Sequence, residues 1–356
     1  MREYEGADLA SYTTMRVGGP AARLVEVSTT DELVDAVREV DDADEELLVV
    51  SGGSNLVISD DGFAGTAVVV RTSGVELESA DGCAGAMVRV AAGEEWDGFV
   101  ARTVAEGWSG VECLSGIPGL AGATPVQNVG AYGQDVAQTI ASVRVYDRHR
   151  QEVRTFANAD CGFTYRHSQF KGTARFVVLD VLFQLELTEQ SQPIAYADLA
   201  RQLGVEQGDR VALADARDGV IAQRRKRGMV LDADDHDTWS CGSFFTNPML
   251  SPADFEVFRR RVTDRLGEGV APPEFPGDRG SLKTSAAWLI DKAGFGKGHG
   301  MPGPAALSTK HTLAVTNRGA ATASDIAALA REVRDGVEAA FGVRLVNEPV
   351  FVGHSL

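Results

Sequence analysis

The sequence contains little cysteine and no metal-binding motif. Its four cysteines, Cys83, Cys113, Cys161 and Cys241, are scattered, with no Cys-x-x-Cys pair. This pattern favours reduced cytosolic thiols over a disulfide framework or a zinc site. The six histidines form no His-Glu-x-x-His motif, so we expect no bound metal.

The sequence also lacks long apolar runs and any excess of positive charge. No segment approaches the ~18 apolar residues of a membrane span, and residues 1–5 lack the apolar stretch of a signal peptide. The formal net charge of −17 argues against non-specific binding to nucleic acids or anionic membranes. We therefore expect a cytoplasmic protein without nucleic-acid, membrane or evident protein partners, although a local basic pocket for an anionic ligand remains compatible with this charge.

The length and composition are those of a globular protein with more than one domain. The chain has 356 residues, of which 44% are hydrophobic and 24% charged, so it is long enough for two or three domains with ample core. The composition shifts after the basic run at residues 224–227, and we expect a domain boundary within residues 215–230.

Periodicity and capping residues predict mixed helices and strands. Residues 29–32 form a capping-box pattern, and Ser251-Pro252 is a typical helix start. The remaining patterns predict helices at 94–106, 212–223, 285–293 and 322–341, and strands at 23–27, 47–50, 66–71, 88–92, 143–147, 152–156, 176–187, 313–316 and 343–352.

A glycine-rich turn follows the apolar strand predicted at residues 47–50. Gly52 and Gly53 permit close approach of a ligand to the backbone, and successive N–H groups in such a turn can bind phosphate oxygens. Ser54 and Asn55 could add side-chain hydrogen bonds. A dinucleotide pyrophosphate site and an ordinary strand–turn–strand are equally compatible with this segment. It matches neither a Rossmann nor a Walker motif.

The stretch of residues 114–133 contains no charged residue. Its glycines and prolines exclude a regular helix or strand over most of its length. A long, uncharged irregular segment is unusual on a protein surface. A surface loop would also leave no binding role for the polar side chains of Gln127, Asn128 and Tyr132. We favour a loop that wraps around a ligand over a low-complexity surface loop.

Polar groups stand beside large apolar ones in three further segments. Arg166, among aromatic residues, suits a carboxylate clamp, although the segment alone favours a surface ion pair. Ser243, between Gly242 and two phenylalanines, is either a proton donor or a buried structural serine, because no histidine base or nucleophile elbow accompanies it. Glu348 lies in an apolar segment and is either an edge-strand charge or a buried acid able to donate a proton.

Taken in order, these segments resemble a known enzyme family. Residues 52–56, 117–133, 165–171 and 242–248, followed by Asn347-Glu348-Pro349, are similar to the successive motifs of the UDP-N-acetylenolpyruvoylglucosamine reductase (MurB) family. The resemblance covers nearly the whole chain, and Tyr196 matches the substrate-loop tyrosine of one subgroup. It implies an α+β fold, with a two-lobed FAD-binding domain of the vanillyl-alcohol-oxidase type and a C-terminal α/β substrate-binding domain.

The resemblance also implies domain limits and residue roles. The FAD-binding domain would span residues 1–220, with lobes at about 1–72 and 73–220, and the substrate domain residues 221–356, its last strand returning toward the FAD site. Arg166, Ser243 and Glu348 would be catalytic. The implied FAD contacts are Gly52, Gly53, Ser54, Asn55, Leu56, Ser115, Gly116, Ile117, Gly119, Gly122, Ala123, Thr124, Gln127, Asn128, Gly130, Ala131 and Tyr132. The implied substrate contacts are Tyr165, Tyr196, Lys226, Arg227, Asn247 and Lys292.

The sequence departs from the family pattern at two positions. The family usually has lysine where Arg227 stands, whereas the lysine here is Lys226, so either residue could contact the substrate. Lys292 stands where some members have glutamine.

The implied reaction is reduction of the enolpyruvyl ether of a UDP-sugar by NADPH through FAD, in peptidoglycan precursor synthesis. Arg166 and Glu348 would stabilise negative charge on the substrate carboxylate, and Ser243 would protonate the α-carbon. Two alternatives remain: a flavin oxidase of the same fold, and a non-catalytic UDP-sugar-binding protein. The first is disfavoured because residues 51–63 and 114–133 lack the histidine that often tethers flavin in such oxidases.

Overall fold

A computed structural model describes all residues, 1–356, and the chain divides into two compact units. Unit 1 comprises Met1–Ala7, Ala21–Gly53 and Ala64–Val230; unit 2 comprises Asp8–Pro20, Ser54–Phe63 and Leu231–Leu356. The chain passes into unit 2 after Val230, at the end of the range expected for the boundary. Two N-terminal segments also belong to unit 2, so a single boundary at 220/221 does not describe this division. The functions assigned to the two domains stay predictions.

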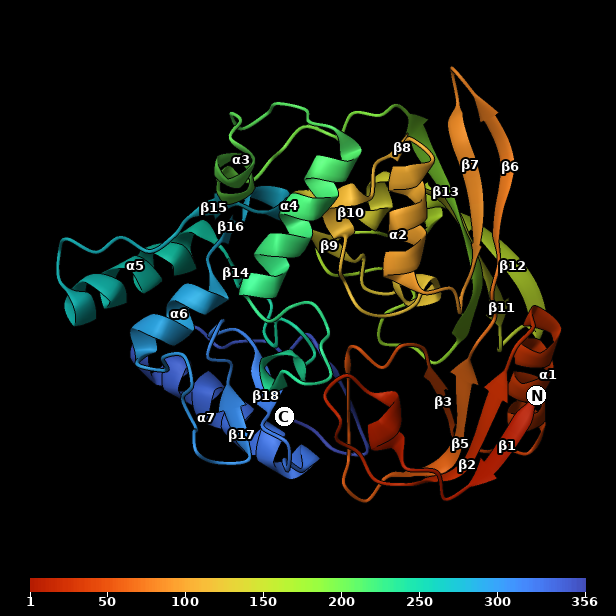
Figure 1. The fold of residues 1–356 in the computed structure, drawn as a ribbon. Helices are drawn as coiled ribbons and strands as arrows, with labels where there is room; N and C mark the ends of the chain where they lie inside the picture. Colours follow the sequence, from red (N-terminus) through yellow and green to blue (C-terminus); the bar gives the residue numbers. More distant parts are fainter. The chain divides into compact units, whose positions relative to one another are not determined.

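Unit 1 contains a four-stranded sheet in the order β1-β2-β5-β3 (Figure 1). Its elements are β1 (Arg2–Glu5), β2 (Ala21–Val27), helix α1 (Thr30–Asp42), β3 (Leu47–Val50) and β5 (Phe63–Val70). Helix α1 begins at the predicted cap, since the Thr29 side chain accepts the amide hydrogen of Glu32. The apolar face of α1, which includes Leu33 and Val37, packs against Val25 and Val68 of the sheet.

A second sheet of unit 1 has the order β12-β11-β13-β7-β6, with β8 paired to β13. Its elements are β6 (Val75–Asp81), β7 (Gly85–Ala91), helix α2 (Trp96–Ala105), β8 (Trp108–Ser109), β11 (Ile140–Asp147), β12 (Glu152–Ala157) and β13 (Phe176–Leu187). Strand β13 has the predicted bounds, and β6 was not predicted because nearly all of its side chains are exposed. Trp96, Phe99 and Phe183 pack with ring centroids 5.2–5.8 Å apart, and burial of each contributes about 1.5–3 kcal/mol.

The rest of unit 1 consists of two helices, a short hairpin and single 3-10 turns. These are η2 (Glu112–Leu114), η3 (Ala121–Ala123), β9 (Gly130–Ala131), β10 (Gln134–Asp135), η4 (Val136–Gln138), η5 (Asn158–Asp160), α3 (Ala197–Leu203) and α4 (Leu213–Lys226). Helix α4 continues three residues beyond the predicted end and includes Arg224. It lies beside α2 (Figure 1).

Unit 2 is built around helix α7 (Ala323–Phe341). Of the two predicted caps, Thr322 and Ser324, Thr322 is the N-cap and forms a capping box with Asp325. Its other elements are η1 (Leu9–Tyr12), β4 (Leu56–Ile58), η6 (His236–Thr238), β14 (Met249–Leu250), α5 (Pro252–Leu266), β15 (Phe275–Pro276), η7 (Asp278–Gly280), β16 (Leu282–Lys283), α6 (Ala286–Ala293), β17 (Ala305–Leu307), β18 (Val315–Asn317) and β19 (Val350–Val352). Helix α5 begins at the predicted cap Ser251, and its Phe255 and Phe258 pack in one core with Phe341 of α7.

The early segment of unit 2 is fixed to C-terminal elements. Strand β4 pairs in parallel with β19, and the Asp60 carboxylate accepts the amide hydrogens of Ala323 and Ser324 at the start of α7. These contacts join residues at least 263 positions apart, so no local pattern could predict them.

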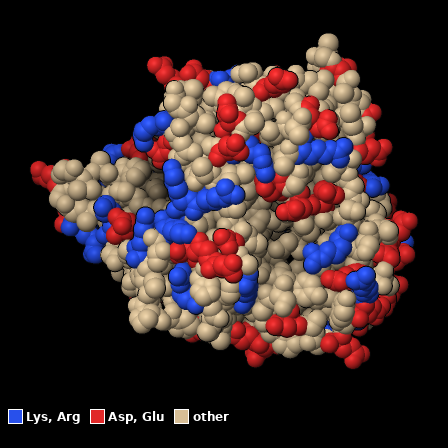
Figure 2. Space-filling model, in the orientation of Figure 1, with Lys and Arg blue, Asp and Glu red and all other residues tan.

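The last strand is shorter than predicted. It covers Val350–Val352 rather than 343–352. Pro349 supplies no N–H for a ladder, and Phe245 makes only an isolated bridge to Asn347. No helix is long and apolar enough to cross a membrane. Basic and acidic side chains are interspersed on the face in Figure 2.

Candidate active site

The glycine turn brings two backbone segments of unit 1 into direct contact. A Cβ added to Gly52 would lie 2.6 Å from the Cα of Gly119, so the turn after β3 touches the uncharged loop without intervening side chains. The Ser51 hydroxyl oxygen is buried and has no hydrogen-bond partner. A buried polar atom without a partner is costly and commonly marks a ligand position.

The uncharged loop is irregular except for a short hairpin. Gly130 and Ala131 pair with Asp135 and Gln134. The two turn residues, Tyr132 and Gly133, have φ of 52° and 89°, as a type I′ turn requires. Tyr132 is 9% exposed, and its ring contacts the half-exposed Tyr196 edge-on at 5.9 Å.

The other predicted cofactor residues of unit 1 are buried or half-buried, and all except Gly53 lie within the uncharged loop. They are Gly53, in the first turn, and Ser115, Gly116, Ile117, Gly122, Ala123, Thr124, Gln127, Asn128 and Ala131. Ser54, Asn55 and Leu56 belong to unit 2.

Arg166 is held against the carbonyl groups of this loop. It lies in a turn closed by mutual backbone hydrogen bonds between Thr164 and His167 and has a φ of 53°. Its guanidinium donates to the carbonyl of Gly130 at 2.5 Å and to that of Asn128 at 3.4 Å. The aromatic ring of Tyr165 lies 5.3 Å from the guanidinium carbon. The structure therefore joins two predicted segments, those around Asn128 and Arg166, into one arrangement.

Arg224 is a residue that sequence reasoning did not assign to the site. It lies in the last turn of α4, and its Nε is buried without a partner. A Cβ on Gly116 would lie 3.5 Å from that Nε. Burial lowers the pKa of Arg224 to about 10, while Tyr132 and Asp97 oppose that shift, so the side chain remains a cation at neutral pH. Its place in the basic run 224–227 was the only sequence signal.

Ser243 of unit 2 is anchored by buried neighbours. Phe244 and Phe245 are 0% and 1% exposed, and the amide of Phe244 donates to the carbonyl of Leu313 at 2.8 Å. Ser243 itself is half-buried. The Cys241 thiol donates to the Leu56 carbonyl at 3.4 Å, and burial raises its pKa to about 12. That thiol therefore stays protonated at neutral pH.

Glu348 lies next to this segment. Its amide donates to the carbonyl of Phe244 at 2.9 Å, and its own carbonyl accepts from the Asn55 side chain at 3.2 Å. It is half-buried and precedes β19, so it is neither an exposed edge-strand charge nor a fully buried acid. Unit 2 thus brings Glu348 and Asn55 together, next to Phe244, which follows Ser243 in the chain.

The predicted substrate residues differ in their surroundings. In unit 1, Lys226 is exposed and its Nζ lies 3.5 Å from Gln202, whereas Arg227 is half-buried and pairs with Asp198 at 3.6 Å. In unit 2, the Asn247 side chain accepts the amide hydrogen of Ala286 at the start of α6, and Lys292 is exposed and pairs with Asp291 at 3.2 Å.

The predicted catalytic residues fall into two groups. Arg166 belongs to unit 1, and Ser243 and Glu348 belong to unit 2. The convergence of all three stays a prediction, as does the role of each.

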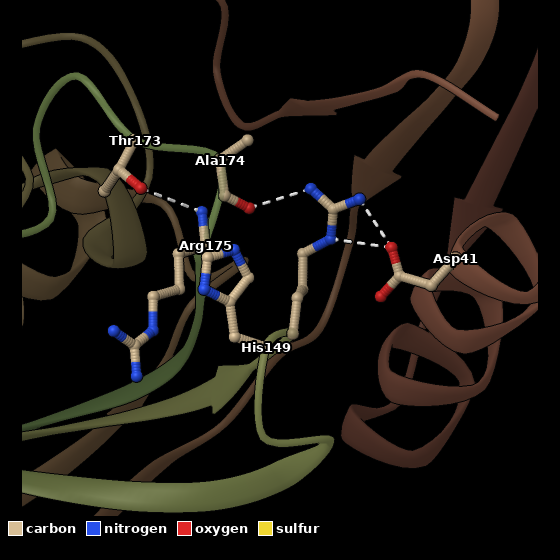
Figure 3. Close-up of a pocket in the computed structure, with 6 residues that line it drawn as sticks. Asp41, His149, Thr173, Ala174 and Arg175 are labelled. Atoms are coloured by element: carbon tan, nitrogen blue, oxygen red, sulfur yellow. Dashed lines mark hydrogen bonds and ion pairs between the residues drawn. The ribbon is translucent and has the colours of Figure 1, made fainter. Parts of the chain in front are cut away.

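A cavity of about 230 Å³ in unit 1 contains none of the predicted residues (Figure 3). It is lined by Asp41, Arg148, His149, Thr173, Ala174 and Arg175. Arg148 donates through Nε and Nη2 to one oxygen of Asp41 and through Nη1 to the carbonyl of Ala174. These hydrogen bonds connect α1, the turn after β11 and the segment before β13.

Two family models match the chain. Residues 21–155 match the FAD binding domain, and residues 234–352 match the C-terminal domain of UDP-N-acetylenolpyruvoylglucosamine reductase. The two matches lie in the order expected from the sequence motifs, with the FAD-binding domain before the C-terminal domain.

Individual proteins are similar over the whole chain. The UDP-N-acetylenolpyruvoylglucosamine reductases of Thermobifida fusca and Streptomyces coelicolor are each 58% identical, covering 98% and 100% of this chain and 97% and 92% of their own lengths. The crystal structure of the corresponding Thermus caldophilus enzyme covers 99% of this chain and 98% of its own, with 24% identity and a TM-score of 0.64. The predicted α+β fold, with an FAD-binding domain followed by a C-terminal domain, is confirmed.

Proposed function

Because the chain belongs to the UDP-N-acetylenolpyruvoylglucosamine reductase family, and is therefore an FAD-dependent oxidoreductase of peptidoglycan synthesis, we propose that it reduces UDP-N-acetylglucosamine enolpyruvate to UDP-N-acetylmuramate with NADPH. The observation that carries this proposal is similarity over 98% of the chain to one named relative. The four free cysteines fit a reducing cytoplasmic setting.

The residues of unit 1 fit a bound FAD. The buried Ser51 hydroxyl and Arg224 Nε lack partners in the protein, and a phosphate or flavin oxygen would accept hydrogen bonds from both. The backbone around Gly52, Gly119 and Gly116 would lie against the cofactor, because glycine leaves its N–H groups accessible. Bound FAD would accept hydride from NADPH and pass it to the enolpyruvyl double bond.

Ser243 is proposed as the proton donor to the substrate α-carbon. A neutral hydroxyl is a weak acid, so it must be held in a fixed position beside charge that has already formed. The buried phenyl rings of Phe244 and Phe245 and the Phe244–Leu313 hydrogen bond supply that rigidity.

Arg166 and Glu348 are proposed to stabilise the negative charge that spreads onto the substrate carboxylate. A preorganised guanidinium needs no reorganisation when charge develops, and Arg166 is already oriented by the Gly130 and Asn128 carbonyls. Glu348 in its protonated form would donate a hydrogen bond to the same carboxylate, from a backbone fixed to Phe244.

Among the proposed substrate contacts, Arg227 is a better candidate than Lys226. Arg227 follows Arg224 by three residues and so lies on the same face of the helix end. Its charge lowers the pKa of Tyr132, although burial outweighs that effect and the net shift is upward. Tyr132 in turn contacts Tyr196, the substrate-loop tyrosine by resemblance. Tyr165, Asn247 and Lys292 remain proposed contacts.

Purification and two assays test this function. The purified chain should be yellow, with the visible spectrum of bound flavin, and should oxidise NADPH only when the enolpyruvyl UDP-sugar is present. A colourless chain that binds the UDP-sugar without consuming NADPH would support the non-catalytic binding protein. Rapid reoxidation by oxygen with release of peroxide would support the oxidase.

A further inference from the structure

A half-buried carboxylate connects α2, α4 and the loop proposed to bind the cofactor in unit 1. Asp97, in the first turn of α2, accepts the amide hydrogen of Gly116 at 2.6 Å through Oδ1. The same oxygen accepts from Arg217 Nη1 at 2.7 Å, and Oδ2 accepts from Arg217 Nη2 at 2.9 Å. Arg217 lies on α4, so one side chain fixes both the loop backbone and the neighbouring helix.

Gly116 is enclosed from the opposite side as well. Its φ is +71°, and an added Cβ would lie 3.2 Å from Val230 and 3.5 Å from Arg224 Nε. Arg217 and Arg224 are seven residues apart, which places them on one face of α4 two turns apart. The Gly116 turn is therefore held between α2 and the end of α4, and the Asp97–Arg217 pair fixes the distance between them.

The pair is charged at neutral pH. Burial opposes ionisation of Asp97, but the Arg217 guanidinium and the Gly116 amide outweigh it, so the pKa of Asp97 lies below its ordinary value. Two parallel N–H···O bonds between ionised groups are among the stronger hydrogen bonds in proteins, and they also fix relative orientation.

We propose that Asp97 and Arg217 are positioning residues for the cofactor: together they hold the Gly116 turn and the Arg224 guanidinium in the geometry that binds FAD. This rests on the proposed function. The loop is uncharged and rich in glycine. Without hydrogen bonds to other elements, its backbone would become ordered only when the cofactor binds, and this ordering would lower the affinity for FAD. A tie made before binding removes that cost.

The test is a titration of apo-protein with FAD, followed by quenching of flavin fluorescence. Asp97→Asn and Arg217→Gln should each raise the dissociation constant for FAD at least about tenfold, the loss expected for one hydrogen bond to a charged group. At saturating FAD, kcat should remain within about threefold of wild type, because neither residue touches the substrate. Arg217→Lys, which keeps the charge but not the fork, should fall between Arg217→Gln and wild type.

Asp41 and Arg148 provide a matched control pair (Figure 3). Their side chains are 15% and 17% exposed, against 31% and 16% for Asp97 and Arg217, and the contacts of their pair do not include the cofactor loop. Asp41→Asn should lower the melting temperature about as much as Asp97→Asn but leave the dissociation constant for FAD unchanged.

Two results would overturn the inference. If the wild-type chain binds no FAD, the proposed function fails and this inference fails with it. If the wild type binds FAD and reduces the substrate, but Asp97→Asn and Asp41→Asn affect FAD binding equally, only the positioning role is rejected. Should Asp97→Asn not fold, Arg217→Lys decides alone, because wild-type FAD affinity in that variant contradicts the proposal.

Discussion

The uncharged loop of unit 1, proposed to bind the cofactor, and the Ser243 segment of unit 2 are built on opposite principles. Residues 114–133 carry no charge, and Gly119 of this loop meets Gly52 through backbone atoms. In the Ser243 segment, a backbone hydrogen bond fixes Glu348 to Phe244, the residue after Ser243, and the proposed chemistry belongs to the side chains of Ser243 and Glu348.

This difference determines which substitutions each region tolerates. A site made of backbone is damaged by any added Cβ at the contact, while changes of side chains that point elsewhere cost little. A site made of side chains loses its chemistry when one functional group is removed, even though the fold survives. Three predictions follow from the contrast, in order of decreasing expected effect.

Removal of the Ser243 hydroxyl should have the largest effect. Ser243→Ala should leave reduction of the flavin by NADPH nearly intact and slow reoxidation by substrate at least ~10²-fold, the low end for a positioned proton donor. Stopped-flow absorbance separates the two half-reactions.

Ser240→Ala is the matched control. Ser240 is buried in the same segment, and its hydroxyl accepts the amide hydrogen of Gly242 at 3.1 Å. It should cost less than about tenfold in either half-reaction, the worth of one ordinary hydrogen bond. If Ser243→Ala slows both half-reactions equally, Ser243 is not the proton donor. The proposal that unit 2 supplies the reactive side chain would then be rejected.

Addition of one methyl group to Gly52 should have the next largest effect. The Cβ of Gly52→Ala would lie 2.6 Å from the Gly119 Cα, so the two backbone segments must separate. Overpacking of this kind costs about 1–3 kcal/mol. The dissociation constant for FAD should therefore rise about tenfold to about a hundredfold. Gly82→Ala is the control, since a Cβ there meets nothing within 4 Å. Wild-type FAD affinity in Gly52→Ala would show that unit 1 does not bind the cofactor through this contact.

The two regions also differ in how far the sequence predicted them. The glycines and prolines of residues 114–133 predicted an irregular loop, and the structure has one apart from short 3-10 turns and a hairpin. Capping residues predicted the starts of α1 and α5 at Thr29 and Ser251, because a cap is a local interaction within one turn. For α7 they left Thr322 and Ser324 as alternatives, and the cap is Thr322.

What the sequence could not predict depends on contacts between distant residues. The pairing of β4 with β19 places residues 54–63 in unit 2, and nothing near residue 56 indicates it. The apolar alternation of residues 343–352 predicted a strand, but Pro349 and the isolated bridge at Asn347 restrict regular pairing to Val350–Val352. Asp97 showed no signal at all, since its role is defined by Gly116 and by Arg217, 120 residues away.

The smallest predicted effect asks whether unit 1 also supplies a charged side chain to the substrate. Arg227→Ala should raise KM for the UDP-sugar about tenfold with little change in kcat, because a charge-assisted contact made equally in ground and transition states alters binding alone. Lys226→Ala is the matched control: it removes a neighbouring positive charge that is exposed and lies near Gln202, and KM should change less than about twofold. Steady-state kinetics at constant ionic strength measure both. A larger effect from Lys226→Ala would assign the substrate contact to the lysine instead. Equal small effects from both variants would mean that residues of unit 2 bind the charge of the substrate. Unit 1 would then contribute no charged side chain from the end of α4, and the contrast between the two regions would be sharper than proposed.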